Sequence, residues 1–566
     1  MMEATAGALL RHWPEDLVGA VCLVGAVVLM VRRANAKQLE KRLTSRAQNQ
    51  REHSFREAER AVLKYKQSHP TKDSTRILRL SLCELMEQLQ DGSLSAEEVL
   101  YAYMEKTLEL QRKLNCCTGI ILDSFEQCKT ISSCKKGLLY GVPISLKENL
   151  CLKNQDSSCG LVKHLEQPAG EDAVLVKVLK KNGAIPFVRT NVPQGLLSYK
   201  CSNPIYGETL NPHNVGKTCG GSSGGEAALI GGGASVMGVG SDLGGSLRVP
   251  ASFCGICSLK PTAGRLSSKG LKSIQGTAGP LAKDVESLAV FMKAVLCDDL
   301  FSLDPTVPPL PFNEEVYRSR NPLTIGYYDH LEQTATSPSM IRAVREVKAL
   351  LERAGHTLVP YRPVRYYEAT ELMTRGVFAD GGATFLQKLN GSTIDPIIKI
   401  QVLACRLPMW LKKLLAFILK PQVQCLAKVF AVADLWKLQA SLEDCVSDTI
   451  TEWKRLNIDV VLCPSLGPAF SFVIKGLSAG MIPHASIYNG LNFSAGVVPV
   501  STVTAQDESD LRHLDKGDLF YPFKEAAAGG LGLPVAVQCV ALPWQDELCL
   551  RFMKEVEELV QRAAHH

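Results

Sequence analysis

The sequence lacks any concentration of charge of one sign, although many of its residues are charged. Its 566 residues include 63 basic and 57 acidic side chains, which leaves a formal net charge of only +6. Nucleic-acid binding needs basic residues gathered in a patch or stripe, so we predict no nucleic-acid partner. The hydrophobic share of 46% and the charged share of 21% are ordinary for a folded, soluble body. The composition therefore argues against disorder, a collagen-like chain and a polytopic membrane protein.

A regular cysteine framework is also missing. The 19 cysteines are odd in number and scattered from Cys22 to Cys549 without repeated spacing, which indicates reduced thiols in a cytosolic setting. Cys254 and Cys257 form one C-x-x-C pair, but a zinc site built on such pairs needs a second one. We expect these two cysteines to be small buried residues, and we predict no metal site.

The apolar run near the N-terminus is short for a membrane span. Leu17–Val31 contains fifteen residues without a charge, and at about 1.5 Å per residue such a helix is shorter than a hydrocarbon core of ~30 Å. Trp13 can lie at one membrane interface, and Arg32 and Arg33 can extend to the other. We expect a single-pass transmembrane anchor here, with a buried core helix as the alternative.

Basic residues follow this run and determine the expected topology. They are Arg32, Arg33, Lys37, Lys41, Arg42, Arg46 and Arg51. By the positive-inside rule, the main body then lies in the cytosol. A secretory signal would carry its basic residues before the run, so cleavage is disfavoured. The expected order is a tail over 1–16, the anchor over 17–33, a polar helical linker over 34–75 and a catalytic body over 76–566.

Helical and strand-like segments alternate in the body after residue 75. Leu80–Leu89 has helical periodicity, and Ser95 followed by Ala-Glu-Glu is typical of the start of another helix. Val460–Leu462 and Val497–Val500 are short β-like runs. This alternation predicts an α/β fold. The proline-rich stretch Asp304–Phe312 is interpreted as a stiff surface connector rather than a docking motif for an SH3-type domain.

Glycine and serine dominate the stretch from Gly216 to Gly255, which is too apolar for a flexible linker. Glycines let the backbone turn tightly and direct consecutive N–H groups at one point, such as a phosphate or an oxyanion. A P-loop would need glycine five residues before Gly216, where Asn211 stands. Nucleotide binding is therefore disfavoured.

A second pattern in this stretch resembles a nucleophile elbow. Gly221–Gly225 satisfies G-x-S-x-G with Ser223 at its centre, but the polar residues before it do not form the buried strand that an elbow requires. A histidine-based serine esterase using Ser223 remains an alternative. Its base would come from a set of histidines without distinguishing context: His330, His356, His484 and His513.

Three segments together resemble the amidase signature family. They are Gly141–Asn149, the sequence GGSSGGEAAL over 220–229, and Asp242–Pro250, in the family's order. The resemblance implies an amide hydrolase with a large mixed twisted β-sheet surrounded by many helices, and a signature core at about 138–290. It also implies that Lys147 is the base, Ser222 the bridging serine and Ser246 the nucleophile, with no cofactor.

The chemistry of these residue types is consistent with those roles. A serine hydroxyl must lose its proton as it attacks, and a lysine can accept that proton only when burial keeps the lysine neutral. Ser222 could relay the proton and later return it to the leaving amine. The backbone N–H groups of an oxyanion hole would come from Leu243, Gly244, Gly245 and Ser246. Ser223, Asp242 and Arg248 would hold this loop in place.

Other segments resemble the membrane-bound fatty acid amide hydrolase branch of this family. Examples are Gly207–Pro212, Ser252–Pro261 and Gly532–Trp544. The resemblance implies fatty acid amide substrates such as N-acylethanolamines, a homodimer, and an active site that opens towards an endomembrane such as the endoplasmic reticulum. It also implies an acyl channel containing Leu196, Leu197 and Phe378, where two leucines replace a larger Met-Phe pair.

A basic amphipathic segment is expected to form a membrane-binding cap over residues 407–438. The apolar residues at helical spacing are Trp410, Leu411, Leu414, Phe417 and Ile418, beside three lysines. An ordinary core hairpin is the alternative for this segment. A catalytically silent lipid-binding membrane adaptor is the alternative for the whole chain.

Overall fold

The fold is that of a computed structural model. It describes residues 15–71, 73–131, 135, 137–272, 276–332, 334, 336–408, 410–411, 432–471, 483–517 and 520–564. Its centre is an eleven-stranded sheet with the strand order β1-β3-β2-β6-β8-β7-β12-β13-β11-β9-β10. The strands are β1 (Cys117–Ile120), β2 (Pro143–Lys147), β3 (Ile185–Thr190), β6 (Met237–Asp242), β7 (Cys257–Lys260), β8 (Thr277–Ala282), β9 (Thr324–Tyr327), β10 (Thr357–Pro360), β11 (Val460–Pro464), β12 (Ser494–Thr502) and β13 (Pro534–Ala541). A separate hairpin pairs β4 (Ser202–Asn203) with β5 (Gly207–Glu208).

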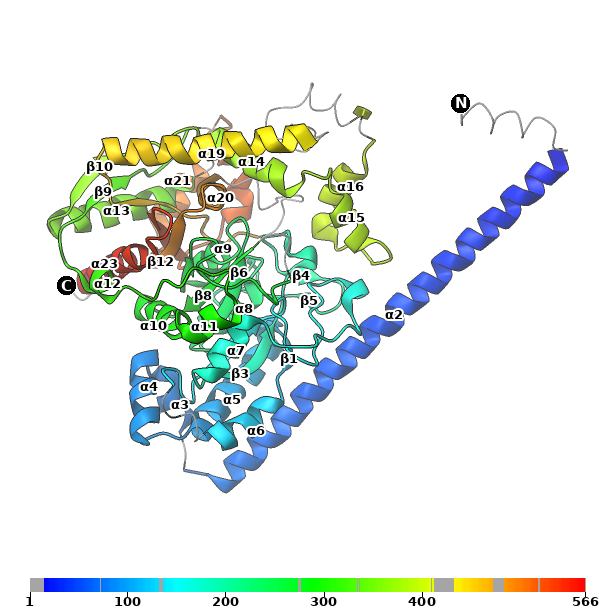
Figure 1. The fold of residues 1–566 in the computed structure, drawn as a ribbon, viewed down its shortest axis with the longest axis horizontal. Helices are drawn as coiled ribbons and strands as arrows, with labels where there is room; N and C mark the ends of the chain where they lie inside the picture. The colour runs from blue at the N-terminus through cyan, green and yellow to red at the C-terminus, as the bar shows by residue number, and fades with distance from the viewer. Residues whose placement is uncertain are drawn as a thin grey trace.

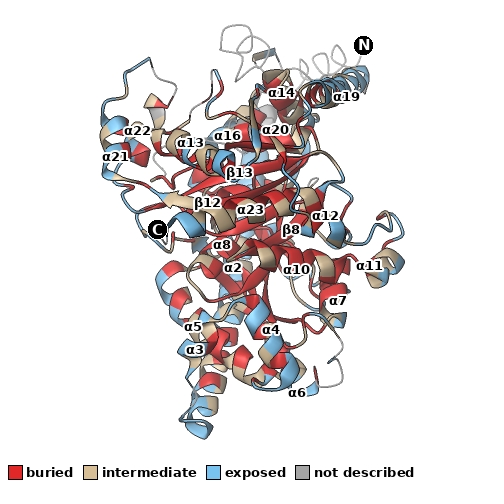
Figure 2. Ribbon diagram, turned by 90° about the vertical axis from the view of Figure 1, so that its left-hand side faces the viewer, coloured by how far each residue is buried: buried red, intermediate tan, exposed pale blue. Residues whose placement is uncertain are grey.

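The sheet is mixed. Strand β2 pairs in parallel with β3 and β6, and β9 pairs in parallel with β10 and β11, whereas the remaining neighbours are antiparallel. Most strands are buried along their whole length, as expected for a sheet that is covered on both faces. Figure 2 shows this buried sheet running through the body, with the exposed residues on the surrounding helices. The predicted α/β class is confirmed.

Helices pack around the sheet (Figure 1). Up to the middle of the chain they are α2 (Glu15–Ser68), α3 (Ser74–Arg79), α4 (Leu82–Asp91), α5 (Ala96–Leu114), α6 (Asp123–Thr130), α7 (Val174–Lys181), α8 (Gly224–Gly231), α9 (Arg248–Cys254), α10 (Val285–Val295), α11 (Asp298–Leu303) and α12 (Glu314–Arg318). The later ones are α13 (Pro338–Arg353), α14 (Tyr366–Val377), α15 (Ala383–Leu389), α16 (Lys399–Arg406), α19 (Val432–Arg455), α20 (Pro483–Gly490), α21 (Ala505–Arg512), α22 (Lys524–Ala527) and α23 (Asp546–Ala564). Two of them matter most for the site: α8 packs on β2, β3 and β6, and α9 packs on β7, β12 and β13.

Several elements begin where the sequence predicts. Ser95 caps α5, and Ser95 and Glu98 form a reciprocal capping box that satisfies N–H groups at the start of the helix. The two β-like runs lie in β11 and β12. The proline-rich stretch connects α11 to α12, and Arg265 donates hydrogen bonds to the carbonyls of Leu310 and Pro311. The described cysteines, Cys254 and Cys257 among them, are all free thiols.

The N-terminal apolar run lies in α2, a continuous helix of 54 residues. Its C-terminal half packs on β1 and α5 through buried residues that include Phe55, Ala58 and Val62. Figure 1 shows its N-terminal half extending away from the body. The single-pass anchor is not confirmed: within the part of the chain that the structure describes, no helix is both long and apolar enough to cross a membrane.

Candidate active site

Strand order brings the predicted residues together at one edge of the sheet. Strands β2 and β6 are parallel neighbours, so their carboxyl ends meet at the same edge. Lys147 is the last residue of β2, and Asp242 is the last residue of β6. The loop after β6 carries Ser246, and the loop before α8 carries Ser222. Residues separated by up to 99 positions in the sequence thus converge here because of the topology.

Lys147 contacts Ser222 directly. The Lys147 Nζ atom donates to the Ser222 Oγ atom at 2.8 Å, and it also donates to Ser241 Oγ at 2.9 Å and to the Ser241 carbonyl at 3.2 Å. The lysine side chain is completely buried. Burial disfavours the ammonium form and lowers the pKa of Lys147 to about 7, although the charge of Asp242 opposes this shift. A buried lysine with this pKa can exchange a proton near neutral pH.

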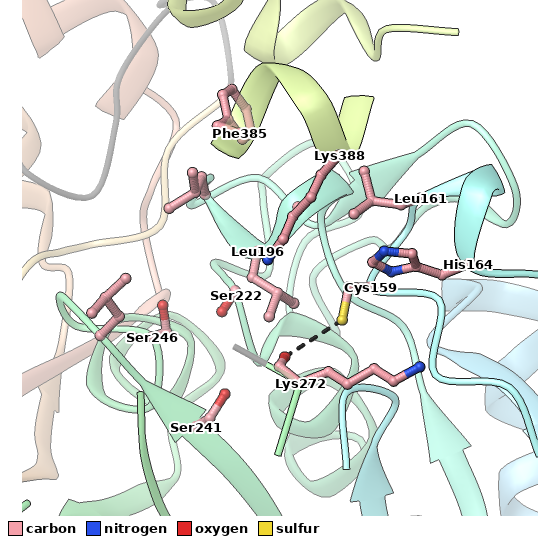
Figure 3. A pocket seen from close by; sticks show the side chains of 13 residues that line it. Cys159, Leu161, His164, Leu196, Ser222, Ser241, Ser246, Lys272, Phe385 and Lys388 are labelled. Atoms are coloured by element: carbon pink, nitrogen blue, oxygen red, sulfur yellow. Dashed lines mark hydrogen bonds between the residues drawn. The ribbon is translucent and has the colours of Figure 1, made fainter. Parts of the chain in front are cut away.

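Ser222 and Ser246 line the same cavity, which has a volume of about 250 Å³. Figure 3 shows both side chains at one end of it, next to Ser241. The two serine loops are joined through the backbone, because the N–H of Ser223 donates to the carbonyl of Ser246 at 3.1 Å. Both serines therefore lie where a molecule bound in this cavity could reach them.

In the loop after β6, some backbone N–H groups are hydrogen-bonded within the protein and others are not. The N–H of Gly245 donates to Asp242 Oδ1 at 2.6 Å, so it is already occupied. Within the described residues, the N–H groups of Leu243, Gly244 and Ser246 have no protein acceptor. Gly245 has a φ of 110°, and a Cβ there would lie 2.8 Å from that of Ala485, so this position requires glycine. Three of the four predicted oxyanion donors remain available.

A buried ion pair holds this loop in position. Arg248 contacts Asp242 at 3.1 Å, and both side chains are fully buried. Arg248 also donates to Gln538 at 2.8 Å and to Asn489 at 2.5 Å. Burial alone would raise the pKa of Asp242, but the charge of Arg248 and hydrogen bonds from Arg248, Gly245 and Leu247 hold it well below its usual value. Asp242 thus stays ionised and fixes the turn that precedes Ser246.

Glu226 is a buried acidic residue that the sequence reasoning missed as part of the site. It lies in α8, and it accepts hydrogen bonds from Ser145 Oγ at 2.6 Å and from Thr190 Oγ1 at 2.7 Å. These contacts fasten the helix after Ser222 to β2 and β3, and β2 carries Lys147. Burial raises the pKa of Glu226 to about 7. A Cβ on Gly238 would lie 1.9 Å from Glu226 Oε2, so glycine makes room for this carboxyl.

The cavity walls are partly apolar and partly cationic. The predicted channel residues Leu196 and Leu197 line the cavity, together with Leu243. Phe378 packs in the same apolar cluster, but the aromatic residue on the cavity wall is Phe385. Further lining residues that the sequence reasoning missed are Cys159, Leu161, His164, Lys272 and Lys388. No local pattern indicates them, because they come from segments that are far apart in the sequence.

The esterase alternative finds no support in the described residues. The Ser223 hydroxyl is fully buried and donates to the Ser241 carbonyl at 3.3 Å. The four histidines considered as its base contact other groups. His484 hydrogen-bonds to Thr336, and His330 contacts Asp329. His356 accepts from the N–H of Leu323, and the exposed His513 contacts the carbonyl of Ser509 through its own Nδ1 atom. None of these four lines the cavity.

The expected membrane cap lies mostly outside the described residues. Trp410 is exposed and Leu411 is half-buried, whereas Leu414, Phe417 and Ile418 are not described. On the C-terminal side, α19 begins at Val432 and carries the exposed Trp436. The cap over 407–438 therefore stays a prediction.

Comparison with known proteins gives consistent matches. Residues 98–550 match the amidase family. Fatty-acid amide hydrolase 1 of Sus scrofa is 44% identical over 564 residues, which is 97% of each chain. Fatty acid amide hydrolase 1 of Caenorhabditis elegans is 37% identical, over 94% of this chain and 98% of its own length. A solved structure of a fatty acid amide hydrolase has a TM-score of 0.76 at 23% identity, covering 93% of this chain and 96% of its own, which is evidence for the fold alone.

Proposed function

The chain belongs to the amidase family and is an amide hydrolase, and from this premise we propose that it uses Ser246 as nucleophile, Ser222 as proton relay and Lys147 as base. The single observation that carries the proposal is the 2.8 Å hydrogen bond between the buried Lys147 Nζ atom and the Ser222 hydroxyl. Among the described residues, no other lysine or arginine side chain donates a hydrogen bond to a serine that lines the cavity.

The proposed reaction has two stages. In the first, the Ser246 Oγ atom attacks the amide carbonyl carbon, its proton passes to Ser222, and the Ser222 proton passes to neutral Lys147. The charge on the carbonyl oxygen is stabilised by the free N–H groups of Leu243, Gly244 and Ser246. The relay then runs in reverse and protonates the nitrogen, so that the amine leaves and an acyl ester remains on Ser246. In the second stage, water attacks the ester carbonyl carbon and gives its proton to the same relay. The relay returns a proton to Ser246 Oγ as the ester bond breaks and the acid leaves.

We propose fatty acid amides, such as N-acylethanolamines and primary fatty amides, as the substrates. Two observations support this class. Two relatives that match nearly the whole chain are named for it, and Leu196, Leu197 and Phe385 give the cavity an apolar wall that suits an acyl chain. A fatty substrate also suits association with a membrane, for which the exposed apolar residues of α2 provide a surface.

The remaining parts of the proposal concern the arrangement of the whole chain. They are membrane attachment through residues 17–33, the polar linker over 34–75, the catalytic body over 76–566 in the cytosol at an endomembrane, the cap over 407–438, and a homodimer. For attachment, the support is the row of exposed apolar residues that begins at Leu23. The basic residues after it are consistent with a cytosolic body.

Covalent labelling tests the chemistry. A fluorophosphonate reacts with activated serines, so we expect it to label the wild-type chain and to leave Ser246→Ala unlabelled. The same substitution should abolish hydrolysis of oleamide. Ser223→Ala is the matched control, because this neighbouring serine is equally buried but does not line the cavity; it should retain labelling. If labelling needs Ser223 and survives loss of Ser246, the proposed nucleophile is wrong.

A further inference from the structure

A second cavity lies where the C-terminal ends of α13 and α23 meet the segment before β9, and it shares no lining residue with the cavity of the active site. Its volume is about 670 Å³. Among the described residues, three arginines line it, Arg320, Arg353 and Arg562, together with His356 and one carboxylate, that of Glu555. Since arginine stays protonated at physiological pH, the cavity wall carries an excess of positive charge.

Two of these arginines have no partner among the described residues. The side chains of Arg320 and Arg353 make no hydrogen bond or ion pair there. The third, Arg562, donates from Nε to the Glu558 carbonyl at 3.2 Å, but its Nη2 atom is 3.8 Å from the Glu558 carboxylate, which is too long for a hydrogen bond. All three side chains therefore keep N–H groups for a ligand.

The helix ends account for only part of this charge. Arg353 and Arg562 lie in the last turns of α13 and α23, where the helix dipole favours a cation. At the end of α13, however, the backbone N–H groups of residues 354–356 already donate to the carbonyls of residues 350–352. Arg320 belongs to neither helix. Helix capping therefore leaves Arg320 and Arg353 without a partner.

His356 presents a fixed N–H group to this cavity. Its side chain is only 7% exposed, and its Nδ1 atom accepts from the backbone N–H of Leu323 at 3.1 Å. A neutral ring therefore carries its proton on Nε2. That nitrogen lies 3.7 Å from the Glu555 carboxylate, beyond hydrogen-bond distance. The buried ring thus keeps one donor for an acceptor atom in the cavity.

A phosphate group suits these donors. It has three terminal oxygens and a charge of about −1.5 to −2, and guanidinium groups bind such oxygens in pairs. Glu555 would repel inorganic phosphate, but it would accept a hydrogen bond from a ligand hydroxyl. Leu350 and Leu559 add apolar surface, and arginine side chains stack on flat aromatic rings. Phosphate, hydroxyl groups and a flat ring together are the parts of a nucleotide, and the volume leaves room for all three.

A phosphoinositide headgroup also carries phosphates and hydroxyl groups. Figure 1 shows the C-terminus and α12 on the side of the molecule opposite the N-terminal half of α2, which is the proposed membrane attachment. The second cavity lies at the end of α23, close to that C-terminus, and so it lies away from the attachment. A soluble ligand fits this position better than a lipid does.

We propose that the second cavity binds a soluble nucleotide. The three arginines and the Nε2 group of His356 bind its phosphate, and Glu555 accepts from a ribose hydroxyl. The site is separate from the catalytic residues, so failure of this proposal would leave the proposed function intact, and the reverse also holds.

Calorimetry on the full-length chain in detergent micelles tests the class of ligand. AMP should bind at least about tenfold more tightly than inorganic phosphate or adenosine, because each of these lacks some of the contacts. Absence of AMP binding, or equal binding of AMP and inorganic phosphate, would overturn the proposal. Tighter binding of inositol bisphosphate, the free headgroup of a phosphoinositide, than of AMP would assign the site to a lipid and would also overturn it.

Substitutions test the position of the site. Arg353→Met should weaken AMP binding about tenfold, because a hydrogen bond between charged groups is lost. Arg345→Met is the matched control, since Arg345 is an exposed arginine of the same helix that does not line the cavity; its affinity for AMP should equal that of the wild type. If Arg353→Met also binds AMP like the wild type, the nucleotide lies elsewhere and the proposal fails.

Glu555 gives a second, independent variant. Glu555→Gln removes the repulsion of phosphate and weakens the acceptor for the hydroxyl, so the ratio of AMP affinity to inorganic phosphate affinity should fall about threefold or more. Circular dichroism spectra identical to that of the wild type show that all three variants are folded. An unchanged ratio in Glu555→Gln would contradict the assigned contact with the ribose.

Discussion

Lys147 is the residue on which the proposed chemistry depends most, because it must lose its proton before it can act as a base. Burial lowers its pKa to about 7, whereas an exposed lysine stays charged at neutral pH. Below this pKa the side chain is an ammonium group and cannot accept a proton from Ser222. Above it, the neutral amine can.

The first prediction follows from this titration. For a neutral fatty amide, kcat/KM should rise with pH through about 7 and level off above it. Lys147→Met should lower kcat by roughly 10²- to 10⁴-fold, the usual contribution of a general base, and should remove the pH dependence. The measurement is a pH–rate profile of initial rates.

A second buried lysine provides the control for that experiment. Lys260 is also fully buried, and burial lowers its pKa to about 8, but its Nζ atom donates to the carbonyl of Pro261 and it does not line the cavity. Lys260→Met should therefore keep the rise with pH near 7. If Lys147→Met retains that rise, some other group titrates and Lys147 is not the base.

For single residues, the sequence indicates candidates that belong to a local pattern. Ser222 and Ser246 lie in short glycine-rich motifs, and Lys147 ends a recognisable strand. Glu226 also lies inside one of these motifs, but its contacts with Ser145 and Thr190 exist only after the chain has folded. Lys388 is further still from any motif, and only the packing of α15 places it at the cavity.

Among the elements, α2 combines two environments in one helix. Near its end, Phe55, Ala58 and Val62 are buried against the body. Near its start the large apolar residues are exposed, and they are Leu23, Val24, Val27, Val28, Leu29, Met30 and Val31. Exposed apolar surface of this extent on a folded chain indicates a binding surface, and the proposed occupant is the membrane.

The corresponding prediction concerns liposome binding by the full-length chain. Leu23→Lys combined with Val27→Lys should reduce co-sedimentation with phospholipid vesicles, because each charge would have to enter an apolar environment. Leu63→Lys is a matched control, since Leu63 is 60% exposed on the same helix but lies in the half that packs on the body. Hydrolysis of a short, soluble amide should be equal in all three proteins.

Equal vesicle binding by the double variant and the wild type would contradict attachment through α2. Binding would then have to reside elsewhere, with the segment over 407–438 as the next candidate.

Short-range signals predict elements well: Ser95 and Glu98 mark the start of α5 through contacts between residues three positions apart. The sequence could not show that the apolar run and most of the polar segment after it form one helix, because that depends on the packing of Phe55 and its neighbours.

In the molecule as a whole, distant parts of the chain are joined by buried polar contacts. Arg265 follows β7, and it contacts Asp546 at 3.5 Å and Glu547 at 2.6 Å, the first two residues of α23. All three side chains are almost completely buried. Helix α23 packs on β12 and β13 near the centre of the sheet, so this cluster ties the C-terminal helix to the segment that follows β7, the middle strand of the sheet.

The stability of the whole fold should therefore depend on Arg265. Arg265→Met leaves Asp546 and Glu547 buried without their cation, and breaking a buried pair in this way costs about 3–5 kcal/mol of unfolding free energy. Arg345→Met is the matched control: its 2.6 Å contact with Asp329 is just as short, but Arg345 is 66% exposed, so solvent screening leaves at most about 1 kcal/mol to lose. Urea unfolding followed by circular dichroism measures both variants. Equal losses would mean that the cluster does not join α23 to the sheet, whereas a large loss in Arg265→Met alone, within one cooperative transition, would show that the site and the C-terminal helix unfold as a unit.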